Sequence, residues 1–167
     1  MLSSAAAYAA LIILVSVNIA AAISDLTSMK IRNELIIVLL VSYVVIAPLA
    51  GISLETMLQS ALIALCILIV SSIMFGFGWI GGGDAKLAAA TSLWMGSYLT
   101  QTYLVNAAII GLGLTVTIIV ARNYRGIISE RCPICSRILT KGEGVPYGVA
   151  LALGALLTLP NSSWFLL

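Results

Sequence analysis

Six apolar runs separated by short polar stretches constrain the fold of this chain more than any other feature. A helix needs about 20 residues, within a range of about 17–25, to cross a bilayer. Backbone polar groups in lipid must be bonded internally, and these runs lack the alternation of barrel strands. The sequence therefore predicts an all-α, polytopic membrane bundle of about six transmembrane helices. The runs are Ala5–Ile23, Leu35–Ala50, Met57–Phe77, Ala85–Tyr98, Tyr103–Ala121 and Val145–Leu167.

Composition supports a single membrane domain. Charged residues make up 8% of the 167 residues and hydrophobic residues 62%, whereas soluble domains carry about 25% charged residues. No polar stretch is long enough for a second domain, so we expect one membrane-embedded domain over residues 1–167. The net charge of +2 gives no argument for a nucleic-acid partner.

The chain contains no histidine, which excludes several kinds of active site. Ser-His and Cys-His nucleophile pairs, a histidine base and histidine metal ligands are all ruled out. Acid–base chemistry near neutral pH must therefore use Asp, Glu, Lys, Cys or Tyr.

A glycine-rich turn carries the first candidate for this chemistry. The sequence Gly-Gly-Gly-Asp-Ala-Lys of residues 81–86 lies between the third and fourth apolar runs. The fourth run is short, and we expect it to begin within the turn and to cross part of the membrane, as broken helices do where they line a cavity. Glycines let a substrate backbone approach Asp84 closely. The alternative is a plain loop in which Asp84 caps the following helix.

Asp25, at the end of the first apolar run, is the second candidate. Ionisable groups at membrane helices are costly, and they are functional candidates for that reason. Taken alone, Asp25 could equally be an interfacial residue paired with Lys30 or Arg32. Paired with Asp84 it would form a dyad that shares one proton, because two close carboxylates do not easily both ionise. One member would take a proton from water while the other assists at a peptide carbonyl. This chemistry needs no metal and no cofactor.

The basic residues predict the orientation. All eight lie on one side of the six predicted helices, which the positive-inside rule makes cytoplasmic. Both termini are then outside, and Asp25 and Asp84 both lie at the cytoplasmic boundary of the inner membrane. No Lys or Arg precedes the first run, which favours an uncleaved first helix over a signal peptide. The eight residues are Lys30, Arg32, Lys86, Arg122, Arg125, Arg131, Arg137 and Lys141.

Three motifs carry a family resemblance. Residues 81–87, Gly-Gly-Gly-Asp-Ala-Lys-Leu, resemble the Gly-x-Gly-Asp motif of type IV prepilin peptidases. Residues 23–25 followed by 31–33 are similar to the first aspartate region of that family, although Arg32 stands where the family often has proline. Residues 145–150 resemble the Pro-Tyr-Gly segment that opens the last helix. The motifs occur in family order and span nearly the whole chain.

The resemblance implies that Asp25 and Asp84 are the catalytic aspartates. It implies supporting or substrate-binding roles for residues around them. Each such residue also has a plainer interpretation, such as a positive-inside anchor for Lys86 or an ordinary helix start for Pro146. The supporting residues are Gly81, Gly83, Lys86, Pro146, Tyr147 and Gly148.

The resemblance also implies a substrate and partners. Such enzymes remove a short, positively charged leader from pilin-like precursors at the cytoplasmic membrane face. The expected partners are a precursor with an N-terminal hydrophobic helix, membrane lipid, and pilus or flagellar assembly machinery. The chain resembles the compact, peptidase-only branch found in tight-adherence pilus and archaeal preflagellin systems, so we expect neither a soluble domain nor a methyltransferase domain. The oligomeric state is left open.

Other functions fit parts of the sequence. Signal-peptide peptidase and presenilin share Gly-x-Gly-Asp, but they add Tyr-Asp and Pro-Ala-Leu motifs, whereas Ser24 precedes Asp25 here and no Pro-Ala-Leu occurs. Membrane aspartates and a glycine-broken helix also suit a small ion-coupled carrier. A non-catalytic subunit of a secretion or pilus assembly machine is a third alternative. Substitution of the aspartates separates these functions.

The three cysteines suggest no disulfide framework, because their number is odd. We expect Cys66, inside an apolar run, to serve packing. Cys132 and Cys135 resemble half a zinc knuckle, but two cysteines without histidine do not complete a four-ligand site. A turn in the cytoplasmic loop is the favoured interpretation, with a site shared by two copies or a redox pair as alternatives.

Overall fold

A computed structural model describes residues 2–123, 144–162 and 164, and all regular structure within them is helical. Three helices are long and apolar enough to cross a membrane, each with a mean hydropathy of 2.3 over its most apolar window, and two shorter helices are also apolar. The prediction of a helical membrane bundle is confirmed. The elements are α1 (Leu2–Ser28), α2 (Asn33–Leu49), α3 (Leu54–Gly76), α4 (Gly82–Asn123), α7 (Tyr147–Thr158) and a short 3₁₀ turn, η1 (Leu159–Asn161).

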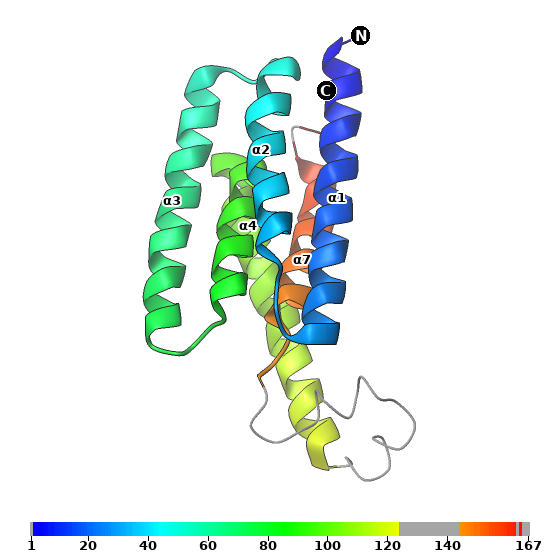
Figure 1. The fold of residues 1–167 in the computed structure, drawn as a ribbon, viewed down its shortest axis with the longest axis vertical. Helices are drawn as coiled ribbons and strands as arrows, with labels where there is room; N and C mark the ends of the chain where they lie inside the picture. Colours follow the sequence, from blue (N-terminus) through cyan, green and yellow to red (C-terminus); the bar gives the residue numbers. More distant parts are fainter. Residues whose placement is uncertain (1, 124–143, 163, 165–167) are drawn as a thin grey trace.

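Helix α4 consists of two halves that run in opposite directions (Figure 1). The break is at Gly96, whose φ of 68° and ψ of −173° are not helical. The first half, 82–95, is about 21 Å long at 1.5 Å per residue, which is shorter than the roughly 30 Å hydrocarbon core. The prediction of a short fourth segment is therefore confirmed.

The sequence placed this break too late. It ended the fourth segment at Tyr98 and began the fifth at Tyr103, whereas residues 97–102 are helical. The reason is backbone geometry: glycine adopts a positive φ at little cost. The hydroxyl of Thr100 donates to the carbonyl of Ser92 across the break at 3.2 Å, which partly compensates the interrupted ladder.

The fourth segment begins within the glycine-rich turn, as predicted. Helix α4 begins at Gly82, so Gly82 and Gly83 are helical and the connection from α3 covers residues 77–81. Asp84 consequently lies in the first helical turn, as predicted. By contrast, α1 continues through Ser28 beyond the last apolar residue of its run, which places Asp25 within the helix rather than after it.

The helices pack around α4 and α7. Helix α1 packs mainly against α2 and α7, and α4 packs mainly against α3 and α7. Gly154 of α7 lies so close to α4 that a Cβ there would be 2.7 Å from the backbone nitrogen of Ala107. Small residues commonly allow membrane helices to approach in this way.

An aromatic cluster packs α2 against the first half of α4. The indole of Trp94 donates to the carbonyl of Leu39 at 3.0 Å, and the indole of Trp164 donates to the carbonyl of Trp94 at 2.8 Å. The Trp94 ring also meets the Tyr43 ring edge to face, with centroids 5.4 Å apart. These contacts join α2, the first half of α4 and the segment after η1.

The prediction that Cys66 serves packing is wrong. Its side chain is exposed on α3 rather than packed inside the bundle. An apolar run in a membrane helix does not mark burial, because the lipid-facing side is apolar as well. Cys132 and Cys135 lie outside the described residues.

The two ends of the bundle differ in charge. The start of α1 and the turn η1 lie at one end, and the α1–α2 and α3–α4 connections lie at the other (Figure 1). Lys30, Arg32, Lys86 and Arg122 belong to the second end. The other four basic residues lie outside the described residues.

Candidate active site

Asp25 lies in the last turn of α1 and is fixed by the start of α7. Its side chain is 5% exposed. The backbone N–H of Gly148 donates to its Oδ2 at 2.7 Å. A Cβ at position 148 would lie 2.8 Å from that oxygen and 3.0 Å from the Asp25 Cβ. Only glycine allows this approach, so the third motif contacts the first aspartate directly.

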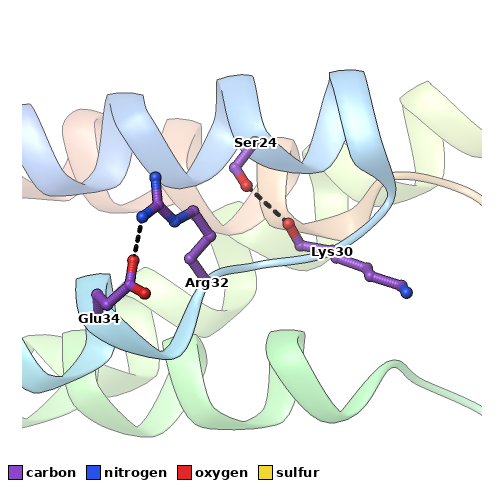
Figure 2. Close-up of polar contacts among 4 residues, drawn as sticks. All are labelled: Ser24, Lys30, Arg32 and Glu34. Carbon is purple, nitrogen blue, oxygen red and sulfur yellow. Dashed lines mark hydrogen bonds and ion pairs between the residues drawn. The ribbon is translucent and has the colours of Figure 1, made fainter.

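The turn after Asp25 is held by local hydrogen bonds. Met29 directly follows α1 and has a φ of 53°, and its N–H donates to the carbonyl of Asp25 at 2.8 Å. The hydroxyl of Ser24 donates to the carbonyl of Lys30 at 2.7 Å (Figure 2). Arg32 forms an ion pair with Glu34 (Figure 2). Within the described part of the chain, neither Lys30 nor Arg32 forms an ion pair with Asp25, whose carboxylate is bonded to Gly148 instead.

Asp84 lies in the first turn of α4, with its carboxylate against the preceding glycine. A Cβ at position 81 would be 2.8 Å from Asp84 Oδ2. A Cβ at position 83 would be 3.1 Å from the Cβ of Ile31, in the α1–α2 connection. Gly81 and Gly83 therefore let the start of α4 approach both its own aspartate and the turn that follows Asp25.

The two aspartates line the same cavities. One cavity of about 350 Å³ and another of about 360 Å³ share Asp25, Met29, Gly81 and Asp84 in their linings. Asp25 and Asp84 are also the only aspartates in the sequence. The fold thus brings both of them to one place at the end of the bundle where the described basic residues gather.

Lys86 lines the first of these cavities but bonds to a neutral partner. Its ammonium donates to Oδ1 of Asn33, the first residue of α2, at 3.0 Å. This bond joins the first turns of α4 and α2 beside the cavity. Sequence reasoning gave Asn33 no role beyond its place in a motif.

Tyr147 lines the second cavity and packs inward. Its hydroxyl lies 3.3 Å from that of Thr115, and its ring fills the space beside Gly111, where a Cβ would be 2.9 Å from Cε1. The preceding Pro146 is buried. The Pro-Tyr-Gly segment is thus more than an ordinary helix start, because it seats α7 on α4 and places Gly148 against Asp25.

Several lining residues were missed by sequence reasoning. They are apolar, and apolar residues in a membrane protein carry no signal of their own. Met29 is an example: its positive φ, uncommon outside glycine, is invisible in the sequence. The missed residues are Met29, Phe75, Trp79 and Ile80.

The site offers two carboxylates, one held by a backbone N–H, beside cavities of water-accessible size at the end of a membrane bundle. Comparison with curated proteins and with solved structures finds no match. The sequence pattern of the type IV leader peptidase family, by contrast, matches residues 12–116. This match covers more than half of the chain and includes Asp25 and Asp84, and we conclude that the chain belongs to the type IV leader peptidase family.

Proposed function

We propose that this protein is a membrane aspartic endopeptidase that removes the leader from pilin-like precursors, with Asp25 and Asp84 as the catalytic pair. The observation that carries the proposal is that the only two aspartates of the chain line the same two cavities. Membership of the leader peptidase family supplies the general activity.

The hydrogen bond from Gly148 suggests which aspartate is the base and which is the acid. An N–H donated to a carboxylate favours its ionised form, and Asp25 accepts one from Gly148. We therefore assign Asp25 as the base that takes a proton from the attacking water. Asp84, which is less buried, protonates the carbonyl oxygen as the water oxygen bonds to the carbonyl carbon. When the C–N bond breaks, the proton on Asp25 passes to the leaving amine, and a hydroxyl of the tetrahedral intermediate returns its proton to Asp84 as the carboxyl group of the leader forms.

The substrate approaches from the cytoplasmic side in this proposal. The four described basic residues belong to the α1–α2 connection and to the two ends of α4, which lie at the same end of the bundle as the last turn of α1 (Figure 1), and the positive-inside rule makes that end cytoplasmic. A precursor whose hydrophobic helix lies in the membrane would then present the bond at its cytoplasmic end to the cavities. Lipid, the precursor and an assembly machinery are the partners that follow.

Cleavage of a co-expressed pilin-like precursor tests the proposal. Asp25→Asn and Asp84→Asn should each abolish shortening of the precursor while the protein still inserts in the membrane. Glu34→Gln is the matched control, because this substitution also removes a carboxylate at the same end of the bundle. Glu34 is paired with Arg32 and lines neither cavity.

Three outcomes would overturn the proposal. Cleavage that persists in either aspartate variant would refute the two-aspartate mechanism. Loss of cleavage in Glu34→Gln to the same degree would mean that charge at this end, rather than the pair, matters. A wild-type protein that cleaves none of several precursors but conducts protons or cations would favour the carrier.

A further inference from the structure

A second polar pair lies deeper in the bundle than the aspartates, on the same two helices. Asn18 of α1 and Thr91 of α4 are both fully buried. The hydroxyl of Thr91 donates to Oδ1 of Asn18 at 3.4 Å. The amide nitrogen of Asn18 donates to the carbonyl of Leu14 at 2.9 Å, which fixes the orientation of the amide.

The spacing of this pair matches that of the aspartates. Asn18 comes seven residues before Asp25, and Thr91 comes seven residues after Asp84. Seven residues are close to two helical turns, so each pair of positions lies on nearly the same helix face, about 10 Å apart along the axis. Helix α1 and the first half of α4 run in opposite directions (Figure 1). The polar pair therefore repeats the aspartate pair one layer deeper in the bundle.

Along α1 and α4 themselves, the residues one turn from each pair are apolar, while the fully buried Tyr103 lies near both Thr91 and Asp84. The apolar residues are Ala21 and Leu87, and both are fully buried. Apolar packing is not directional, and α1 and α4 each pack mainly against other helices. Hydrogen bonds are directional, and the Asn18–Thr91 bond, although long at 3.4 Å, joins α1 directly to α4. It can therefore set the register of these helices where apolar contact alone would not.

We propose that Asn18 and Thr91 are positioning residues that hold Asp25 and Asp84 in register for catalysis. This inference rests on the proposed function. Polar side chains often join membrane helices by such bonds. A misplacement of about 1 Å in a catalytic group can cost roughly a hundredfold in rate, so a small slip of α1 along α4 is enough to slow the reaction.

Isosteric substitution tests the bond. Thr91→Val keeps the shape of the side chain and removes the hydroxyl, whereas Thr91→Ser keeps the hydroxyl. In purified protein cleaving a pilin-like precursor, Thr91→Val should lower kcat at least about tenfold with KM unchanged within about twofold, because the loss falls on the transition state. Thr91→Ser should stay within about threefold of wild type. Asn18→Leu should match Thr91→Val, and the double variant should be no slower than either single one.

The chain offers a matched control for a purely structural role. Asn106 and Thr158 form another interhelical bond, with the Asn106 amide donating to the Thr158 hydroxyl at 3.0 Å. Thr158 is fully buried and lies about 15 Å along α7 from Gly148, at 1.5 Å per residue. Thr158→Val should lower the Tm about as much as Thr91→Val while leaving kcat at the wild-type value.

The outcomes separate this inference from the proposed function. If Asp25→Asn and Asp84→Asn abolish cleavage but Thr91→Val keeps the wild-type kcat, the positioning inference is wrong and the dyad stands. If Thr91→Ser or Thr158→Val is as slow as Thr91→Val, the effect is not due to this bond and the inference is again wrong. If cleavage survives in an aspartate variant, the proposed function itself fails. Should Asn18→Leu not insert in the membrane, the Thr91 variants decide alone.

Discussion

Gly148→Ala perturbs the contact between α7 and Asp25 by a single methyl group. The added Cβ would lie 2.8 Å from Asp25 Oδ2, 3.0 Å from its Cβ and 2.9 Å from Cδ1 of Ile31. Ordinary van der Waals contacts lie at 3.4–4 Å, so the carboxylate oxygen must retreat by roughly 0.6 Å. Because the neighbouring Cβ and the Ile31 side chain are also too close, a simple rotation of the carboxylate does not relieve the contact.

The magnitude follows from two effects. Displacement lengthens the 2.7 Å bond from the Gly148 N–H to the carboxylate, and hydrogen bonds to charged groups contribute about 1.5–3 kcal/mol. A loss of that size, if it falls on the transition state, is a decrease of roughly 10–100-fold in kcat. We therefore expect kcat to fall by about that factor in precursor cleavage by protein in lipid nanodiscs. The extra methyl group should also lower the free energy of unfolding by about 1–3 kcal/mol.

Gly113→Ala is the matched control for this prediction. Gly113 is also helical, but a Cβ there meets nothing within 4 Å. Its replacement should leave kcat unchanged and leave the protein as stable or slightly more stable, since glycine disfavours a helix by roughly 0.5–1 kcal/mol relative to alanine. A folded Gly148→Ala protein with wild-type kcat would refute the reasoning, as would a Gly113→Ala protein that is equally slow.

Three further predictions follow from single contacts. Asn33→Ala and Lys86→Leu should each lower kcat/KM by up to about tenfold, because a hydrogen bond contributes about 0.5–1.5 kcal/mol. Lys86→Gln still donates to Asn33 and should be near wild type. An equal loss of kcat/KM in Lys86→Gln would show that the charge of Lys86 matters instead. Gly154→Ala should lower the free energy of unfolding by about 1–3 kcal/mol, because its Cβ would meet the Ala107 backbone, and an unchanged Tm in thermal unfolding would contradict this. Met29→Gly should be more stable than Met29→Ala by about 1 kcal/mol, because only glycine adopts a positive φ freely, and chemical denaturation in detergent would expose the opposite order.

The sequence was a good guide where the membrane imposes a simple rule. The lengths of the apolar runs predicted the helices, because backbone groups in lipid must be bonded within a helix. It was a poor guide to which side of a helix is buried. Cys66 lies in an apolar run and yet is exposed, since lipid-facing and core-facing residues are equally apolar. Boundaries were also uncertain where glycine decides them, as the break at Gly96 shows.

The sequence also predicted only part of the candidate site. Asp25 and Asp84 could be selected from the sequence, because a charge beside a membrane helix is rare and costly. The family resemblance named Gly148 and other supporting residues, but the sequence did not show what they contact. The hydrogen bond from Gly148 to Asp25 joins residues that are distant along the chain, and the roles of Met29 and Asn33 depend on a backbone angle and on one contact with Lys86.

By itself, the sequence determined that this chain is a helical membrane protein with two aspartates near one end, because hydropathy and charge act locally along the chain. Only the tertiary structure decided that Asp25 and Asp84 line the same cavities and that α7 supplies an N–H to one of them. It also decided that Thr91 bonds to Asn18 deeper in the bundle than the two aspartates. The physical reason is that such contacts depend on the rotation and register of helices packed side by side, and these are set by interhelical contacts that no single segment encodes.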